Sequence, residues 1–485
     1  MPRRAGIRVL WLAPLLAISA CAHEQVARTP FPVVERAPEP GLPISILPVS
    51  GLDTSGDAEP EESESEHTTP PPAAASALTL DDFERLALEH NPSLAQSAAV
   101  VHKAQGIRQQ VGLLPNPTAG YTGQEIGADG TAGQQGAFVS QTIVTGDKLR
   151  LNRIAADQNI NQLLWELEAQ RHRVRNGVRM QFYETLGAQR RRELTRELVA
   201  IAGQGAAATR QLRDAQRVAD LDVLQAEVQE SSVRILAGNA EAEYEAAWRK
   251  LSALAGRPEL EPAPLDGNLD RNAGSEAGEF DALWQELRAA SPELQAAQAR
   301  INRAFAQLQR EQAQPVPNVE AQVSVAHDYS SGDEIAGVQI GLPLPIFNRN
   351  QGHIQAATAE YHRAVHEARR LELSLRNRLA DAFQQYRQAR RQVDIYQDEI
   401  LPRAQKTLDL TARGYELGQL DLLRVLSARQ TYFESSLAAI RAAVALRQAE
   451  VVLSGMLLTG GLNDVPDLPT DAGGAGNRGQ ALSGQ

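Results

Sequence analysis

Few residues of this 485-residue chain have the type and spacing that chemistry needs. The sequence contains no P-loop, HExxH, GxSxG or CxxC pattern, so the usual arrangements for binding phosphate, holding zinc or activating a nucleophile are missing. His362 and His366 form the most suggestive pair, because an i, i+4 spacing puts two imidazoles on one helix face, where they could hold a metal ion. The alternative is that both histidines are solvent-exposed helix residues, which the same spacing also allows. The sequence therefore predicts no catalytic residue, no cofactor and no specific metal site.

Aspartates next to two short breaks in the helical pattern are the other candidates. Asp222 follows the break "VADL" and Asp421 follows "ELGQL", where Gly418 suits a left-handed helix end. An aspartate that opens a helix caps its free amide groups. Carboxylates gathered from several chains around one opening would also attract cations and repel anions. Both roles are open for Asp222 and Asp421.

The N-terminal residues 1–20 are typical of an export signal. Arg3, Arg4 and Arg8 precede a short apolar core from Val9 to Ile18. The sequence "ISAC" that ends at Cys21 is similar to a bacterial lipobox, and this resemblance implies that Cys21 is lipidated at the outer membrane. The alternative is a plain secretory signal. Cys21 is the only cysteine, so the chain cannot form an internal disulfide.

Composition separates the rest of the chain into three parts. Residues 21–77 are rich in Pro, Glu, Ser and Thr, which predicts a disordered tether, and the Gly-rich residues 464–485 predict a disordered tail. Ala, Gln, Arg, Glu and Leu dominate much of the remainder, as is typical of long helices in coiled-coil contact. The net charge of −12 argues against nucleic acid as a partner. After the N-terminus, no apolar run approaches the roughly 20 residues of a membrane helix.

The central part of the chain is an internal duplication. Pro92 and Leu94 recur as Pro292 and Leu294, at an offset of 200 residues. Self-similarity of this kind predicts two structural repeats, which we place at residues 78–279 and 280–463. Each repeat is expected to hold a helix, two strands, a very long helix and a shorter helix. The expected ranges are 80–111, 119–126, 137–144, 147–217 and 222–255 in the first repeat, and 280–312, 318–327, 335–344, 351–415 and 421–457 in the second.

The two strands of the second repeat alternate apolar and polar residues over about nine positions, which is enough to span a bilayer when tilted. The alternative is a soluble β-hairpin with one solvent-exposed face. Four strands cannot close a membrane barrel, whereas three chains together would supply twelve strands. Prolines mark most of the expected junctions between strand and helix, because a missing N–H ends a ladder and a fixed φ turns the chain. These prolines are Pro115, Pro117, Pro315, Pro317, Pro343 and Pro345.

The expected helices are better suited to an elongated layer of helices than to a compact globule. The long helix of the first repeat is about 70 residues, or roughly 105 Å, and the two shorter helices together match that length. The last helix carries apolar residues at heptad spacing, with Gln430 and Arg447 between them. These apolar residues are Leu423, Leu426, Phe433, Leu437, Ile440, Val444 and Val451. Leu379, Phe383, Tyr386, Val393 and Ile400 form a similar stripe on the second long helix.

The duplicated layout, together with "HNPSL", "LLPNPT", "SQTIVTGDKLRLNR", "GLPLPIFNRNQG" and "GYELGQLDLLRVLSARQ", resembles the TolC-type outer-membrane efflux factor family. The resemblance covers Leu78 to about Leu458, and the third and fourth segments are most similar to the cobalt-zinc-cadmium resistance branch. It implies an α+β fold that is mostly α, with four membrane strands and a long periplasmic α-helical barrel. It also implies a homotrimer that shares a twelve-stranded barrel in the outer membrane.

The same resemblance implies a passive exit duct rather than an enzyme. Its partners would be a periplasmic adaptor and an inner-membrane pump of the RND type. Its favoured cargo would be divalent heavy-metal cations. Efflux of drugs and other organic toxicants, type I protein secretion and a purely structural envelope coiled coil are the alternatives. The resemblance places adaptor docking and the gate at the two helix breaks. The residues it assigns there are Arg217, Val218, Ala219, Asp220, Leu221 and Asp222 at the first break, and Tyr415, Gly418, Gln419, Leu420 and Asp421 at the second.

Overall fold

A computed structural model describes residues 77–130, 132–216, 218–269 and 278–462. The predicted signal peptide, Cys21, nearly all of the tether and the predicted tail lie outside these residues. All described residues belong to one compact unit of the chain, residues 70–485. Within the described residues, every helix is too short or too polar to cross a membrane.

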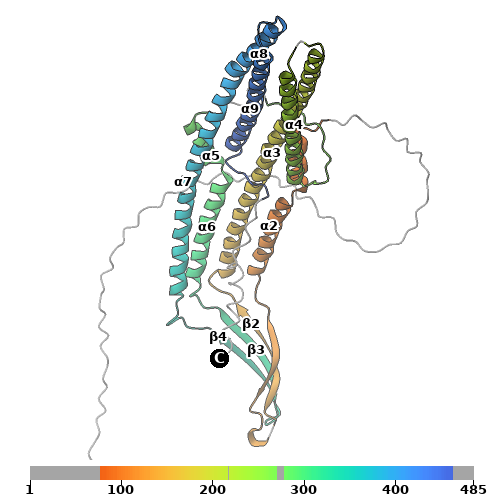
Figure 1. The fold of residues 1–485 in the computed structure, drawn as a ribbon. Coiled ribbons are helices and arrows are strands. Elements are labelled where there is room, and N and C mark those ends of the chain that lie inside the picture. Colours follow the sequence, from red (N-terminus) through yellow and green to blue (C-terminus); the bar gives the residue numbers. More distant parts are fainter. Residues whose placement is uncertain (1–76, 131, 217, 270–277, 463–485) are drawn as a thin grey trace, which may run out of the picture. The chain divides into compact units, whose positions relative to one another are not determined.

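The order of elements confirms the internal duplication (Figure 1). The first repeat contains α1 (Leu80–His90), α2 (Pro92–Val111), β1 (Thr118–Gln124), a 3-10 turn η1 (Ala128–Gly130), β2 (Gln134–Ile143), α3 (Lys148–Asp214) and α4 (Asp220–Leu254). The second contains α5 (Phe280–Ala290), α6 (Pro292–Ala313), β3 (Val319–Asp328), β4 (Glu334–Gly341), α7 (Gln351–Ile395), the π-helical turn η3 (Tyr396–Ile400), α8 (Leu401–Glu416) and α9 (Leu422–Ser454). The four predicted strands are present, with bounds shifted by up to three residues.

The prediction of single helices over 80–111 and 280–312 is wrong, because each is two helices. The breaks fall at Asn91 (φ −71°, ψ 120°) and Ser291 (φ −61°, ψ 118°), which are extended. Each precedes a proline, and the proline ring disfavours helical geometry in the residue before it. Pro92 and Pro292 then start the next helix, where a missing N–H costs nothing. The repeated prolines therefore mark a helix break in both repeats.

The second long helix is also interrupted, unlike the unbroken 67-residue α3. A π-helical turn at Tyr396–Ile400 separates α7 from α8, and Pro402 is in the first turn of α8. Pro402 cannot donate to the carbonyl of Asp398, and its ring would clash with that carbonyl in a regular helix. One widened turn relieves the clash, which is why the prediction of one helix over 351–415 is only partly right.

The four strands form one antiparallel sheet in the order β1-β2-β3-β4, which leaves β1 and β4 at its edges. Val323 pairs with Val338, and Val325 lies next along the same face of β3. These three side chains are 54%, 75% and 56% exposed, so the apolar face of the sheet is not covered by the described part of the chain.

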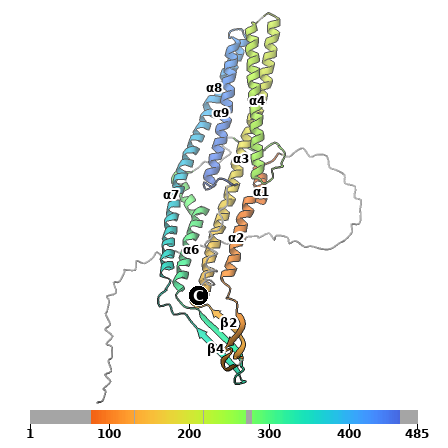
Figure 2. The same ribbon diagram turned by 60° about the horizontal axis from the view of Figure 1, so that its bottom comes forward.

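The helices lie side by side as a layer with α3 at its centre (Figures 1 and 2). Near the strands the neighbours follow the order α2-α3-α6-α7. Towards the interhelical turns the order becomes α4-α3-α9-α8. One edge of the layer therefore consists of α2 and α4, and the other of α7 and α8.

The largest core cluster holds α1 and α4 against α3. Phe83 is buried with its ring centroid about 6 Å from those of Phe182 and Trp248, and Trp248 Nε1 donates to Leu260 O at 2.8 Å. The stripe predicted on the second long helix is confirmed at Leu379, Tyr386 and Val393, each at most 6% exposed.

The stripe predicted on the last helix needs correction. Leu423 is 58% exposed, whereas Val425 and Ala428 are buried in its place. Arg447, expected at a polar position beside the stripe, is only 2% exposed and pairs with Glu450 at 2.7 Å. Its own ion pair permits this charge in the core.

Candidate functional site: the two interhelical turns

The first interhelical turn joins α3 to α4. Arg217 lies outside the described residues, Val218 and Ala219 are extended or bent, and α4 begins at Asp220. The N-cap position of α4 is therefore Ala219, and the interpretation of Asp222 as an N-cap is wrong. Asp222 occupies the third helical position, and its carboxylate accepts a hydrogen bond from Ala219 N at 3.1 Å. This bond satisfies a free amide at the helix start just as an N-cap side chain would.

The second interhelical turn, between α8 and α9, is closed by backbone hydrogen bonds. Gly418 has φ +71°, a conformation that glycine adopts without strain. Gly418 N donates to Tyr415 O at 2.9 Å, and Gln419 N donates to Gly414 O at 2.8 Å. These bonds form a left-handed helix end, as the glycine predicted. Leu420 folds back over Gly414, where a Cβ atom would lie 2.6 Å from Leu420 Cδ1.

Asp421 is the N-cap of α9, as predicted. Its carboxylate accepts from Arg424 N at 3.1 Å and lies 4.0 Å from the Arg424 guanidinium. Both side chains are about 70% exposed, so solvent screens this ion pair. Capping therefore uses carboxylate oxygens at both turns, at Asp222 and at Asp421. The exposed apolar groups there are Leu221, 63% exposed, and Leu417, 72% exposed.

The remaining candidates do not join this site. His362 and His366 are exposed on α7, and no group of three or more His, Cys, Asp or Glu side chains in the described residues could hold a metal ion. The six prolines lie in the connections between elements: Pro115 and Pro117 between α2 and β1, Pro315 and Pro317 between α6 and β3, and Pro343 and Pro345 between β4 and α7. The fourth connection, between β2 and α3, contains Gly146 with φ +65°.

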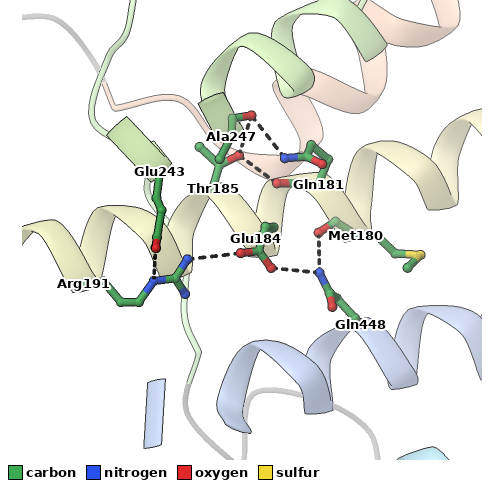
Figure 3. A network of polar contacts seen from close by, with 8 residues as sticks. All are labelled: Met180, Gln181, Glu184, Thr185, Arg191, Glu243, Ala247 and Gln448. Carbon is green, nitrogen blue, oxygen red and sulfur yellow. Dashed lines mark hydrogen bonds and ion pairs between the residues drawn. The ribbon is translucent and has the colours of Figure 1, made fainter. Parts of the chain in front are cut away.

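Sequence reasoning missed a polar network that joins α3 to both of its neighbours (Figure 3). Arg191 is 8% exposed and pairs with Glu184 at 3.1 Å and with Glu243 of α4 at 3.2 Å. Gln448 of α9 donates to Glu184 Oε2 at 3.3 Å and to Met180 O at 3.3 Å. The i, i+7 spacing of Glu184 and Arg191 was the one available signal, because it puts both side chains on one helix face.

Two stretches of the chain, residues 85–257 and 283–458, match the family model for outer membrane efflux proteins. The matched stretches correspond to the two repeats and include both interhelical turns. The chain therefore belongs to this family of outer-membrane efflux channels, as its resemblance to TolC-type proteins indicated.

Individual relatives agree with this assignment. The chain is 28% identical over 369 residues to the cobalt-zinc-cadmium resistance protein CzcC of Cupriavidus metallidurans, an alignment that covers 75% of this chain and 86% of CzcC. Its fold is similar to that of a membrane protein from Pseudomonas aeruginosa (TM-score 0.67, 21% identity, 78% of this chain and 92% of that one). It is also similar to the outer membrane protein VceC of Vibrio cholerae (TM-score 0.64, 18% identity, 78% and 96%).

Proposed function

We propose that this chain is the exit duct of a tripartite efflux system and that its favoured cargo is divalent heavy-metal cations. The observation that carries the proposal is the similarity to the cobalt-zinc-cadmium resistance protein CzcC over most of both chains. The duct does no chemistry: an inner-membrane pump, of the RND type, supplies the energy, and a periplasmic adaptor connects the pump to the duct.

The open edges of the sheet support a homotrimer. β1 and β4 are edge strands, and unpaired backbone groups are prohibitive in lipid. Three copies pair β4 of one with β1 of the next, which makes a closed barrel of twelve strands. The helical layers then extend the duct into the periplasm, and Cys21 adds a lipid anchor. Labelled palmitate should be incorporated by the native chain and not by a Cys21→Ser variant; equal labelling would exclude this anchor.

Growth of a deletion strain tests the cargo. The strain is compared with its parent across gradients of zinc, cobalt, cadmium, copper and nickel, and across a panel of dyes and antibiotics. We expect hypersensitivity to metals alone, restored by the native gene. Sensitivity to organic compounds alone would contradict the metal cargo and favour drug efflux. Loss of a secreted protein without either sensitivity would favour type I secretion.

The two interhelical turns are the proposed docking site and gate. Asp220 and Gln419 lie in or beside these turns, and both residues are exposed. Asp220→Lys reverses a charge at the first turn, and Gln419→Lys adds a positive charge at the second. The double variant should lose cross-linking to the adaptor, while the trimer stays intact. Unchanged cross-linking would show that the adaptor docks elsewhere. At the same turns, Asp220, Asp222 and Asp421 from three copies would raise the local concentration of cations.

A further inference from the structure

Helix α5 packs beside α7 (Figure 1), and an open groove of about 710 Å³ lies along α7 where α5 begins. Two aromatic rings, Phe280 of α5 and Phe383 of α7, form its apolar end, with ring centroids 5.9 Å apart. Arg387 and Arg391 follow about one and two turns further along α7 and make the other end basic. The lining that the structure describes contains no carboxylate. The groove therefore suits a ligand with an apolar part and a negative part.

The charges of both arginines are available to a ligand. Within the described residues, neither Arg387 nor Arg391 forms an ion pair. Arg390, which lies between them in the sequence, pairs with Asp394 at 3.5 Å. Arg387 is exposed, and its guanidinium carbon lies 5.9 Å from the centroid of the Phe383 ring. A guanidinium group binds a carboxylate through two parallel hydrogen bonds, so the basic end of the groove suits carboxylates.

The spacing of these side chains along α7 matches that of an extended peptide. Phe383, Arg387 and Arg391 follow one another at steps of four residues, and each step is about 6 Å along a helix axis. Alternate residues of an extended chain are about 7 Å apart and point to the same side. An apolar side chain followed by two carboxylates, each two residues further on, would therefore meet the aromatic ring and the two guanidinium groups in turn.

A row of glutamines runs beside this first row. Gln384, Gln388 and Gln392 line the groove, are exposed and repeat at the same step of four residues. A primary amide offers both donors and an acceptor, which are the groups that a peptide main chain needs as partners. The main chain of an extended peptide repeats every two residues, so each glutamine can meet one repeat. This second row favours a peptide as the occupant.

We infer that this groove binds an extended acidic segment of a partner protein. An apolar residue of the segment lies on the rings of Phe280 and Phe383, and carboxylates two and four residues away pair with Arg387 and Arg391. This inference goes beyond the proposed duct, because it assigns a partner to the middle of the helical layer. Arg391 is about 40 Å of helix away from Gly418, so the groove is separate from the proposed docking site at the interhelical turns.

A labelled peptide tests the groove in the purified full-length protein. The probe is the fluorescein-labelled peptide Glu-Ser-Glu-Ser-Leu-Ser-Glu-Ser-Glu, which has glutamates two and four residues from the leucine on both sides, so either chain direction fits. We expect fluorescence anisotropy to show saturable binding, at least tenfold weaker in the Arg387→Gln, Arg391→Gln double variant. The matched control is Arg369→Gln with Arg370→Gln, which removes two exposed arginines roughly 30 Å away on α7 and should leave binding unchanged.

Two comparison ligands complete the test. The peptide Glu-Glu-Ser-Ser-Leu-Ser-Ser-Glu-Glu has the same composition but no glutamate two residues from the leucine, so we expect it to bind at least threefold more weakly. Absence of binding, equal binding of the two peptides or an equal loss in both double variants would overturn the inference. Tighter binding of a hyaluronan hexasaccharide would also overturn it and assign the groove to an anionic glycan. Each of these failures leaves the duct standing, because growth on metals tests the duct separately.

Discussion

At the residue scale, buried polar side chains decide how distant parts of the chain meet. Asn176 is 1% exposed and donates to Gly455 O at 2.8 Å and to Leu458 O at 2.7 Å, which fixes the end of α9 on α3. Ser93 donates to Gly461 O at 2.9 Å in the same region. Because an unsatisfied buried carbonyl costs about 1–3 kcal/mol, these bonds specify one arrangement of the two repeats.

His172 on α3 gives the protein a pH dependence that can be measured. Burial lowers the pKa of His172 below its usual 6.5, while Glu168, 3.6 Å away, opposes the shift in part. The unfolded state therefore binds the proton more readily than the native state. Stability is fully present above pH 6.5 and is lost as the pH falls through the lower pKa of the folded protein.

Thermal unfolding at pH 7.5 and pH 5 tests this dependence. His172→Gln removes the titrating group, so we expect its melting temperature to fall less between the two pH values than that of the native protein. His366→Gln is the control, because His366 is exposed on α7. If the melting temperature of the His172→Gln variant falls as much as that of the native protein, the pH dependence belongs to other groups.

At the element scale, close approach of α3 and α9 depends on a glycine. Gly187 faces Val444, and a Cβ atom on Gly187 would overlap Val444 Cγ2. Gly203, in the same helix, has no atom within 4 Å of the position where a Cβ would lie. The packing of α3 against α9 therefore leaves no room for a side chain at Gly187, whereas a side chain at Gly203 would meet no neighbour.

Alanine at these two positions should change stability in opposite directions. Gly187→Ala forces α9 away from α3 and should lower the free energy of unfolding by about 1–3 kcal/mol. Gly203→Ala should raise it by about 0.5–1 kcal/mol, because alanine loses less backbone entropy in a helix. The check is denaturant unfolding of both variants. Two changes of the same sign would show that Val444 moves aside and that helix propensity dominates.

At the scale of the whole molecule, the network around Arg191 links helices of both repeats. Glu184 accepts from Arg191 of its own helix and from Gln448 of α9, while Glu243 brings α4 to the same guanidinium (Figure 3). The network lies in the part of the layer where α4 and α9 are the neighbours of α3. Its loss should therefore loosen α4 and α9 together.

Glu184→Ala should lower the free energy of unfolding by about 1–2 kcal/mol, because it leaves the nearly buried Arg191 with one carboxylate fewer. Glu245→Ala is the control: its pair with Arg249 is exposed, so the expected change is below about 0.5 kcal/mol. Hydrogen exchange in α4 and α9 is the second measurement. Faster exchange in only one of these helices would contradict a link between them.

The repeat and the element types could be read from the sequence alone. Pro92 and Pro292 at one offset, alternation in the strands and heptad spacing in the helices are local patterns, and they determined the duplication, the four strands and the long helices. The sequence also placed the second turn within a few residues, because Gly418 and Asp421 have strong local preferences.

Only the tertiary structure decided which faces of the helices meet. Heptad spacing cannot distinguish the buried face of α4, with Ala226 and Val233, from its exposed face, with Leu221 and Val228, since both pairs follow the same period. It also could not place Arg447 in the core or Leu423 at the surface, because those outcomes depend on which face of α9 its neighbouring helices cover. The network around Arg191 joins residues more than 250 positions apart, and contacts at that separation leave no periodic signal in the chain.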